Sequence, residues 1–227
     1  MHKIDALKEL KELLDERKFE ECLFLSEDIM NSTRNKPYLL YLRSQCYSGL
    51  NQHDQAVLEL KEALKLEPKG GNYHGALASC YVEMGKGQIN KDDAKYHEFL
   101  DLALECLKES LARGATKNHR TWNSLGDISV LKGDYEVAKE YYDKAIGIAD
   151  YDWWAYNGKG LIFQKEGNYA KSLEHFDKAI ECLNKILASK TEKTNLDKNG
   201  IALQQVKERR EECKKMAESS KNGFEFH

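Results

Sequence analysis

A repeated pattern of about 34 residues constrains this chain more than any other feature. Trp122-Asn123-Ser124-Leu125-Gly126 aligns with Tyr156-Asn157-Gly158-Lys159-Gly160 at this shift. The same shift carries Gly133-Asp134-Tyr135 onto Gly167-Asn168-Tyr169, Tyr142 onto Phe176 and Ala145 onto Ala179. A chain that repeats at this period is predicted to stack similar units, each of which contacts mainly its neighbours.

The order of residue types within one unit predicts two helices joined by a tight turn. Gly126 and Gly160 follow an aromatic residue by four positions, where a missing side chain lets a neighbouring helix approach closely. Gly133 and Gly167 stand where the first helix of each unit is expected to end, because glycine readily adopts the positive φ of a helix C-terminus.

These residues resemble the tetratricopeptide repeat family, whose pattern of W, L, G, Y, A, F, A and P recurs over 34 residues. The matching positions are Trp122, Leu125, Gly126, Ala138, Tyr142 and Ala145 in one unit, Gly160, Phe163, Phe176 and Ala179 in the next, and Pro37, Tyr47, Ala56, Leu60, Ala63 and Pro68 earlier in the chain. The resemblance implies an all-α, right-handed superhelical solenoid of antiparallel helix hairpins with a C-terminal capping helix.

The resemblance divides the chain into about five units. They are expected near residues 3–36, 37–70, 71–118, 119–152 and 153–189. The third unit exceeds one period by about 14 residues, which we interpret as an insertion at about 85–98 that expands the turn and extends the second helix. A polar linker is expected at 190–198, a capping helix at 199–220 with an apolar stripe that includes Leu203, Val206, Cys213 and Met216, and a frayed tail at 221–227.

Composition excludes several classes of protein. The chain is 41% hydrophobic and 32% charged with a formal net charge of −3, which argues against disorder and against a nucleic-acid-binding field. It has no apolar stretch of about 18 residues and no apolar run after Met1 that resembles a signal peptide, so we expect a cytoplasmic protein without a membrane span. The six cysteines stand singly, a pattern that favours free, buried thiols.

No pattern in the chain predicts catalysis. Gly85-Lys86-Gly87 and Gly158-Lys159-Gly160 lack the spacing of a phosphate-binding loop. The seven histidines do not pair at metal-ligand spacing, and no H-E-x-x-H motif occurs. The Ser, Cys and His residues show no nucleophile signature. We therefore expect no enzymatic activity, no cofactor and no metal.

The resemblance also implies where a partner would bind. In this family the second, fifth and ninth places of each first helix face the inner surface of the solenoid. They correspond here to Tyr38, Tyr41, Gln45, Asn72, Gly75, Ser79, Arg120, Asn123, Asp127, Trp154, Asn157 and Leu161. Asn123 and Asn157 offer donors and acceptors to a peptide backbone, and Trp154 and the tyrosines are typical binding anchors. The alternative is that these aromatic side chains fill the packing between repeats or meet the C-terminal helix.

One known ligand class is not supported. A subfamily of these repeats holds the C-terminal carboxylate of chaperone tails with a lysine–asparagine set, and the corresponding places here are Leu7, Lys11, Leu42, Asn72 and Ala76. The leading hypothesis is thus a non-catalytic scaffold or adaptor, a monomer or weak homo-oligomer, that binds a peptide or helix. Replacing Asn123 and Asn157 with Ala is expected to weaken partner capture without loss of stability.

Two alternatives remain open. The C-terminal helix or tail would pack into a neighbour's groove in a self-associating structural assembly. A helical repeat could also bind RNA through the basic cluster Arg209, Arg210, Lys214 and Lys215, although these residues are interleaved with glutamates typical of a solvated helix face.

Overall fold

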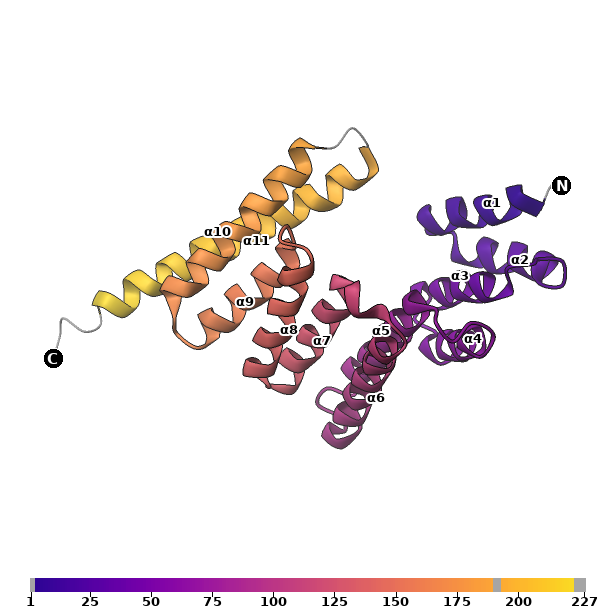
Figure 1. Cartoon of the computed structure of the whole chain (residues 1–227), viewed down its shortest axis with the longest axis horizontal. Coiled ribbons are helices and arrows are strands. Elements are labelled where there is room, and N and C mark those ends of the chain that lie inside the picture. Colours follow the sequence, from indigo (N-terminus) through magenta and orange to yellow (C-terminus); the bar gives the residue numbers. More distant parts are fainter. Residues whose placement is uncertain (1–2, 190–192, 223–227) are drawn as a thin grey trace. The chain divides into compact units, whose positions relative to one another are not determined.

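The structure is a computed structural model that describes residues 3–189 and 193–222, and its regular elements in these ranges are helices (Figure 1). In chain order they are α1 (Lys3–Asp15), α2 (Phe19–Met30), α3 (Lys36–Gly49), α4 (His53–Leu66), α5 (Gly71–Lys86), α6 (Asp93–Ala112), the short 3₁₀ helix η1 (Ala115–Lys117), α7 (His119–Lys132), α8 (Tyr135–Ile148), α9 (Trp153–Lys165), α10 (Tyr169–Ala188) and α11 (Lys193–Asn222). The all-α class that the sequence predicts is confirmed.

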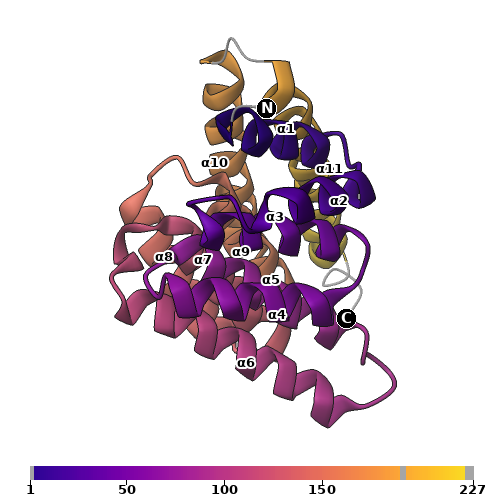
Figure 2. The same cartoon turned by 90° about the vertical axis from the view of Figure 1, so that its right-hand side faces the viewer.

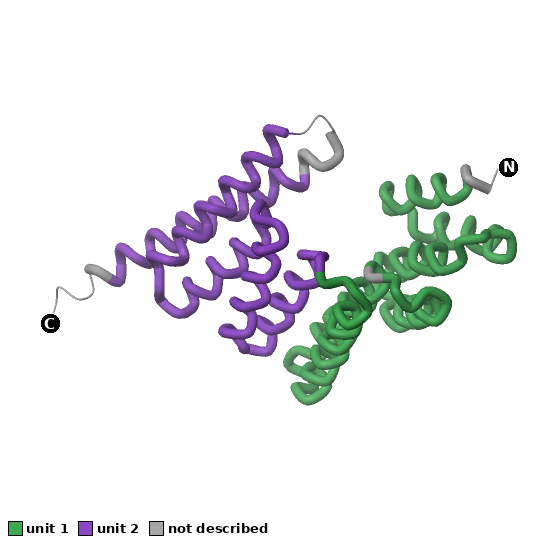
Figure 3. The backbone as a smooth tube through the Cα atoms, viewed as in Figure 1, with its two compact units in different colours: residues 1–116 green, residues 117–227 purple. Residues whose placement is uncertain are grey.

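The chain forms two compact units, Met1–Thr116 and Lys117–His227 (Figure 3). Unit 1 contains three helix hairpins, α1–α2, α3–α4 and α5–α6, each packed against the next (Figure 2). The first helices of successive hairpins also touch, because α1 contacts α3 and α3 contacts α5. Leu10, Cys22, Leu39, Leu42 and Cys46 form the buried core between the first two hairpins.

Local sequence explains where α3 begins. Pro37 lies in its first turn, where the missing N–H of proline leaves no hydrogen bond unmade. Asn35 caps the helix, since its side-chain oxygen accepts a hydrogen bond from the backbone N–H of Tyr38 at 3.3 Å. This cap fixes the start of the first helix of the second hairpin.

The third hairpin is longer than the second, in its turn and in its helices. α5 continues to Lys86 and α6 begins at Asp93, so six residues, 87–92, join these helices, whereas three residues, 50–52, join α3 and α4. Asp92 caps α6 by accepting from the backbone N–H of Lys95 at 2.9 Å. The additional residues lie in the turn and in both helices, because α5 and α6 have 16 and 20 residues against 14 each in α3 and α4. Gly85 packs within α5, where an added Cβ would meet Phe99 Cβ at 3.3 Å.

Unit 2 contains the hairpins α7–α8 and α9–α10 followed by α11. Gly133 and Gly167 have φ angles of 85° and 74° and end the first helix of each hairpin, as the sequence predicts. The two hairpins pack through contacts of α8 and α7 with α9. Ala138, Tyr142 and Ala145 from α8 are buried there with Ala155 and Ile162 from α9.

The last helix covers the apolar face of α10. Ala202, Val206 and Cys213 of α11 join Phe176, Ala179 and Leu183 of α10 in one buried cluster. The helix begins at Lys193, six positions before the expected boundary at 199. A polar stretch without proline is compatible with a helix, and Gly200 weakens this helix by only about 1 kcal/mol. Residues 190–192 of the expected linker and 223–227 of the expected tail lie outside the described residues.

Three further observations bear on the expected class. No helix among the described residues is long and apolar enough to cross a membrane. In the same residues no group of His, Cys, Asp or Glu side chains is arranged to hold a metal ion. All six cysteines are free thiols, five of them buried and Cys106 partly buried, in agreement with the prediction for this pattern.

Candidate functional site

A cavity of about 690 Å³ in unit 2 brings together four of the predicted binding residues. Its walls come from the first nine residues of α7, the residues just before α9 and the start of that helix, the end of α10 and the first part of α11. The lining residues are His119, Arg120, Asn123, Ser124, Asp127, Tyr151, Asp152, Trp153, Trp154, Ile186, Ser189 and Asn199. We call this space the unit 2 cavity.

Asp152 organises one side of the unit 2 cavity. Its Oδ2 atom lies 2.6 Å from Nδ1 of His119 and accepts from Nδ2 of Asn123 at 2.7 Å. Its Oδ1 atom caps α9 by accepting from the backbone N–H groups of Trp154 and Ala155. One buried carboxylate thus fixes the start of α9 against α7. The amide nitrogen of Asn123 is engaged in this contact and is not available to a partner.

Asp127 forms the other polar wall. Its carboxylate accepts from the Tyr142 hydroxyl at 2.7 Å and from Nε1 of Trp154 at 3.0 and 3.1 Å. Burial raises the pKa of Asp127 above its usual value, while these two hydrogen bonds oppose the shift. The Trp154 side chain remains 46% exposed, so its ring faces solvent beside a carboxylate.

Tyr142 reaches Asp127 through a gap left by two glycines. A Cβ at Gly126 would lie 2.6 Å from the Tyr142 ring, and one at Gly158 would lie 2.5 Å from it. The sequence predicts the close approach at Gly126, whereas Gly158 has Ser124 as its equivalent in the preceding repeat and gives no such signal. The ring is buried between α7 and α9 and connects their packing to the polar wall.

Asn157 is placed differently from the other predicted residues of unit 2. It is buried on α9, and its Oδ1 accepts a hydrogen bond from Nη1 of Arg209 at 3.0 Å. Arg209 belongs to α11, so the last helix covers this side chain. Asn157 and Asn123 do share equivalent repeat positions, but each amide is engaged with a different element of unit 2.

This engagement changes the expected effect of alanine at the two asparagines. Asn123→Ala removes one of the hydrogen bonds to the buried Asp152 carboxylate, and Asn157→Ala removes the acceptor of the Arg209 guanidinium. Each substitution is expected to lower the free energy of unfolding by about 1–3 kcal/mol. Urea unfolding followed by tryptophan fluorescence measures the loss. Asn184→Ala is the control, because Asn184 is exposed on α10 of the same unit; equal stability of all three variants would contradict these hydrogen bonds.

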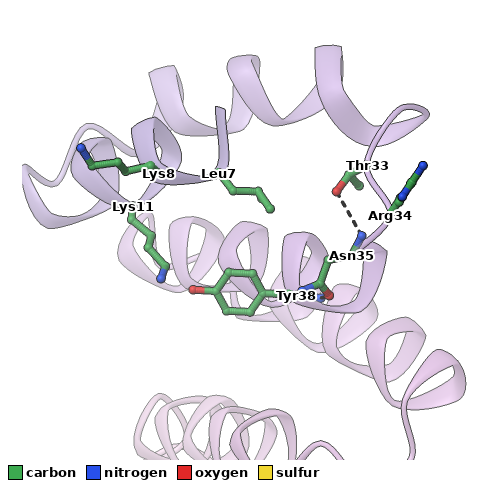
Figure 4. A pocket seen from close by; sticks show the side chains of 7 residues that line it. All are labelled: Leu7, Lys8, Lys11, Thr33, Arg34, Asn35 and Tyr38. Atoms are coloured by element: carbon green, nitrogen blue, oxygen red, sulfur yellow. Dashed lines mark hydrogen bonds between the residues drawn. The ribbon is translucent and has the colours of Figure 1, made fainter. Parts of the chain in front are cut away.

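A second cavity, of about 560 Å³, lies in unit 1 (Figure 4). Leu7, Lys8, Lys11, Thr33, Arg34, Asn35 and Tyr38 line it, with three cations and no carboxylate among them. Lys11 Nζ lies 5.3 Å from the centre of the Tyr38 ring, within range of a cation–π interaction. The hydroxyl of Thr33 accepts from the backbone N–H of Asn35 at 3.2 Å and shapes the rim.

Tyr38 begins a row of aromatic rings in unit 1. Its ring centre lies 6.0 Å from that of Tyr41, and the Tyr41 ring lies 5.4 Å from Tyr73 on α5. Nε2 of Gln45 donates to the Tyr41 hydroxyl at 2.7 Å. Burial and the neighbouring Glu67 raise the pKa of Tyr73 to about 12, so its hydroxyl stays protonated and donates to that carboxylate. Tyr38, Tyr41 and Gln45 therefore form one connected surface, with Tyr73 packed beneath it.

The remaining predicted residues are scattered. Asn72 and Ser79 are exposed on α5 and line neither of the two cavities described above. Sequence reasoning missed Asp152 and His119, although an aspartate immediately before a predicted helix is a recognisable capping signal. It also assigned no binding role to Lys8 and Arg34, which lie outside the repeat's inward-facing positions.

The family model described as tetratricopeptide repeat matches residues 37–69, 119–152 and 155–188. The chain is a tetratricopeptide repeat protein. The three matches coincide with the hairpins α3–α4, α7–α8 and α9–α10. The residues that first suggested the family lie in the second and third matches.

Two curated relatives match part of the chain. BBSome complex member BBS4 of Bos taurus is 28% identical over 130 residues, which are 57% of this chain and 21% of that protein. A TPR repeat-containing protein of Methanocaldococcus jannaschii is 31% identical over 116 residues, 51% of this chain and 17% of its own length. The chain therefore spans about a fifth of the length of the curated relatives it matches.

Solved structures of other tetratricopeptide proteins share the fold. The thermophilic TPR protein TTC0263 of Thermus thermophilus aligns with a TM-score of 0.71 at 16% identity, covering 90% of this chain and 98% of that one. A MamA crystal structure aligns with a TM-score of 0.59 at 20% identity, covering 74% and 90% of the two chains. Identities this low establish the fold and leave the ligand to be argued from this chain's own residues.

Proposed function

We propose that this protein is a non-catalytic interaction module that binds a peptide segment of a protein partner in the unit 2 cavity. The observation that carries the proposal is Trp154, a half-exposed indole whose N–H group is held by Asp127 beside a cavity of about 690 Å³. Exposed tryptophans fixed in one orientation are typical binding hot spots, because they bury a large area at little cost in conformational entropy.

The setting of Trp154 supports a peptide rather than a small molecule. Tyr151, 57% exposed, provides a second aromatic side chain in the lining, and Arg120 and Ser124 add polar groups. This mixture of aromatic and polar groups in an open cavity suits alternating side chains and backbone amides of an extended segment. One relative is a BBSome complex member and one solved structure of the same fold is an APC/C hetero-tetramer, which is consistent with a role in an assembly.

Two of the four basic residues behind the RNA-binding alternative have structural partners. Arg209 donates to Asn157, and Arg210 pairs with Asp177 at 2.5 Å and with Glu211 at 3.0 Å. Both arginine side chains therefore contact other residues of unit 2 and help to hold α11 in place. A protein partner in the unit 2 cavity remains the function that the residues support best.

A peptide array tests the proposal directly. Peptides of about 12 residues and diverse sequence are probed with the intact protein and with Trp154→Ala. Loss of a hot-spot side chain is expected to weaken the bound peptides roughly 30-fold. Phe24→Ala is the matched control, since Phe24 is an exposed aromatic residue on α2 in unit 1. Binding that survives Trp154→Ala, or an array without any bound peptide, would overturn the proposal.

A further inference from the structure

Two hydrogen-bond donors in the lining of the unit 2 cavity are occupied, and one buried acceptor has no partner. Nδ2 of Asn123 donates to Asp152, and Nε1 of Trp154 donates to Asp127. Within the part of the chain that the structure describes, Oδ1 of Asn123 is buried without a hydrogen-bond partner. A buried, unpaired carbonyl oxygen is unfavourable by about 1–3 kcal/mol. A ligand that donates an N–H group to this oxygen would therefore gain binding free energy.

Asp127 has no cationic partner of its own. Its hydrogen bonds come from a phenol and an indole, both uncharged, and within residues 3–189 and 193–222 no Lys, Arg or His forms an ion pair with it. Asp152 differs, because His119 lies against it. Arg120 lines the same cavity, but its side chain is exposed. A partly buried carboxylate without a counter-charge attracts a cation more strongly than one in water does.

Trp154 places an aromatic face beside this carboxylate. Its indole N–H points to Asp127, so the ring lies edge-on to the carboxylate and leaves a face toward solvent. Tryptophan is the side chain with the strongest cation–π attraction, and the interaction extends to about 6 Å from the ring centre. A flat or elongated cation can therefore contact the ring face and the carboxylate together.

We propose that the unit 2 cavity selects a basic residue of the partner peptide, with the guanidinium or ammonium group at Asp127 and Asn123 Oδ1 and the aliphatic stem over Trp154. This inference rests on the proposed function and specifies its ligand. An acidic side chain would meet Asp127 with like charge, and an apolar one would leave the Asn123 oxygen unpaired. The cation-lined cavity of unit 1 has the opposite charge and is not expected to bind the same side chain.

Nuclear magnetic resonance of the tryptophan indoles tests this placement on the intact chain. The protein has three tryptophans, and Trp154→Phe assigns the Trp154 N–H signal. The probe is the capped tripeptide acetyl-Gly-Arg-Gly-amide, with its citrulline analogue as a neutral control of the same shape and its lysine analogue as the second cation. We expect the arginine and lysine peptides to shift the Trp154 signal with Kd on the order of 1 mM, and citrulline to bind at least about tenfold more weakly.

Asp127→Asn is the decisive variant. The substitution keeps the shape of the side chain and removes its charge, and because burial raises the pKa of Asp127, loss of that charge is not expected to unfold the protein. The preference for arginine over citrulline should fall about tenfold in Asp127→Asn and persist in Asp28→Asn, which neutralises an exposed aspartate on α2.

Each outcome decides the inference. Equal binding of arginine and citrulline, an unchanged preference in Asp127→Asn, or no shift of the Trp154 signal at about 20 mM peptide would overturn it. The two proposals fail separately: if array peptides bind through Trp154 without enrichment in Lys or Arg, the proposed function stands and the basic ligand does not. If the array binds nothing, both fall.

Discussion

Val206→Asp is expected to lower the free energy of unfolding of unit 2 by about 3–5 kcal/mol. Val206 is 1% exposed and belongs to the cluster that joins α11 to Phe176 and Leu183 of α10. An aspartate there would bury an unpaired charge in an apolar environment, or α11 would detach and expose the cluster. Either response removes a large fraction of the stability of an ordinary domain, which is about 5–15 kcal/mol.

Tryptophan fluorescence during urea unfolding measures this loss in unit 2 alone, because Trp122, Trp153 and Trp154 all lie between Lys117 and His227. Ile201→Asp is the matched control. Ile201 is also β-branched and also on α11, but it is 60% exposed, so its replacement is expected to change the free energy by less than about 0.5 kcal/mol. Equal midpoints for the two variants would contradict the packing of α11 on α10.

The sequence predicts most of the fold because each hairpin is defined by local signals. Positive φ at Gly133 and Gly167 and the cap at Asn35 lie within a few residues of the helix ends they determine. The repeat adds the close approach of Gly160 to Phe176, since both positions recur at the family spacing. The start of α11 at Lys193 is harder to predict, because polar residues are compatible with both a linker and a helix.

The site is less predictable because its contacts join residues distant in sequence. The repeat places Asn123, Asp127 and Trp154 on first helices, but it does not reveal that Asp152 connects α7 to α9. Arg209 and Asn157 are separated by 52 positions, and a charged residue on a predicted solvated face gives no signal of the buried amide it covers. Periodicity therefore identifies the helix face, and only packing shows which side chains on it remain available to a partner.

Gly158→Ala is expected to lower the free energy of unfolding of unit 2 by about 1–3 kcal/mol. In a helix interior this substitution normally stabilises by roughly 0.5–1 kcal/mol, so the predicted sign is reversed. The reason is Tyr142: an added Cβ would lie 2.5 Å from its Cζ and 2.8 Å from its hydroxyl oxygen. The ring is 2% exposed and its hydroxyl donates to Asp127, which leaves it no free space to move.

Gly147→Ala is the control for a glycine in a helix without a clash. Gly147 lies in α8 with no atom within 4 Å of the added Cβ, so the substitution is expected to raise the free energy of unfolding. A double-mutant cycle then isolates the contact. In a Tyr142→Leu background the clash is removed, so Gly158→Ala should cost at least about 1 kcal/mol less than in the native chain. The same penalty in both backgrounds would show that Tyr142 does not require a glycine at position 158. That result would contradict the argument that two glycines position the tyrosine at Asp127.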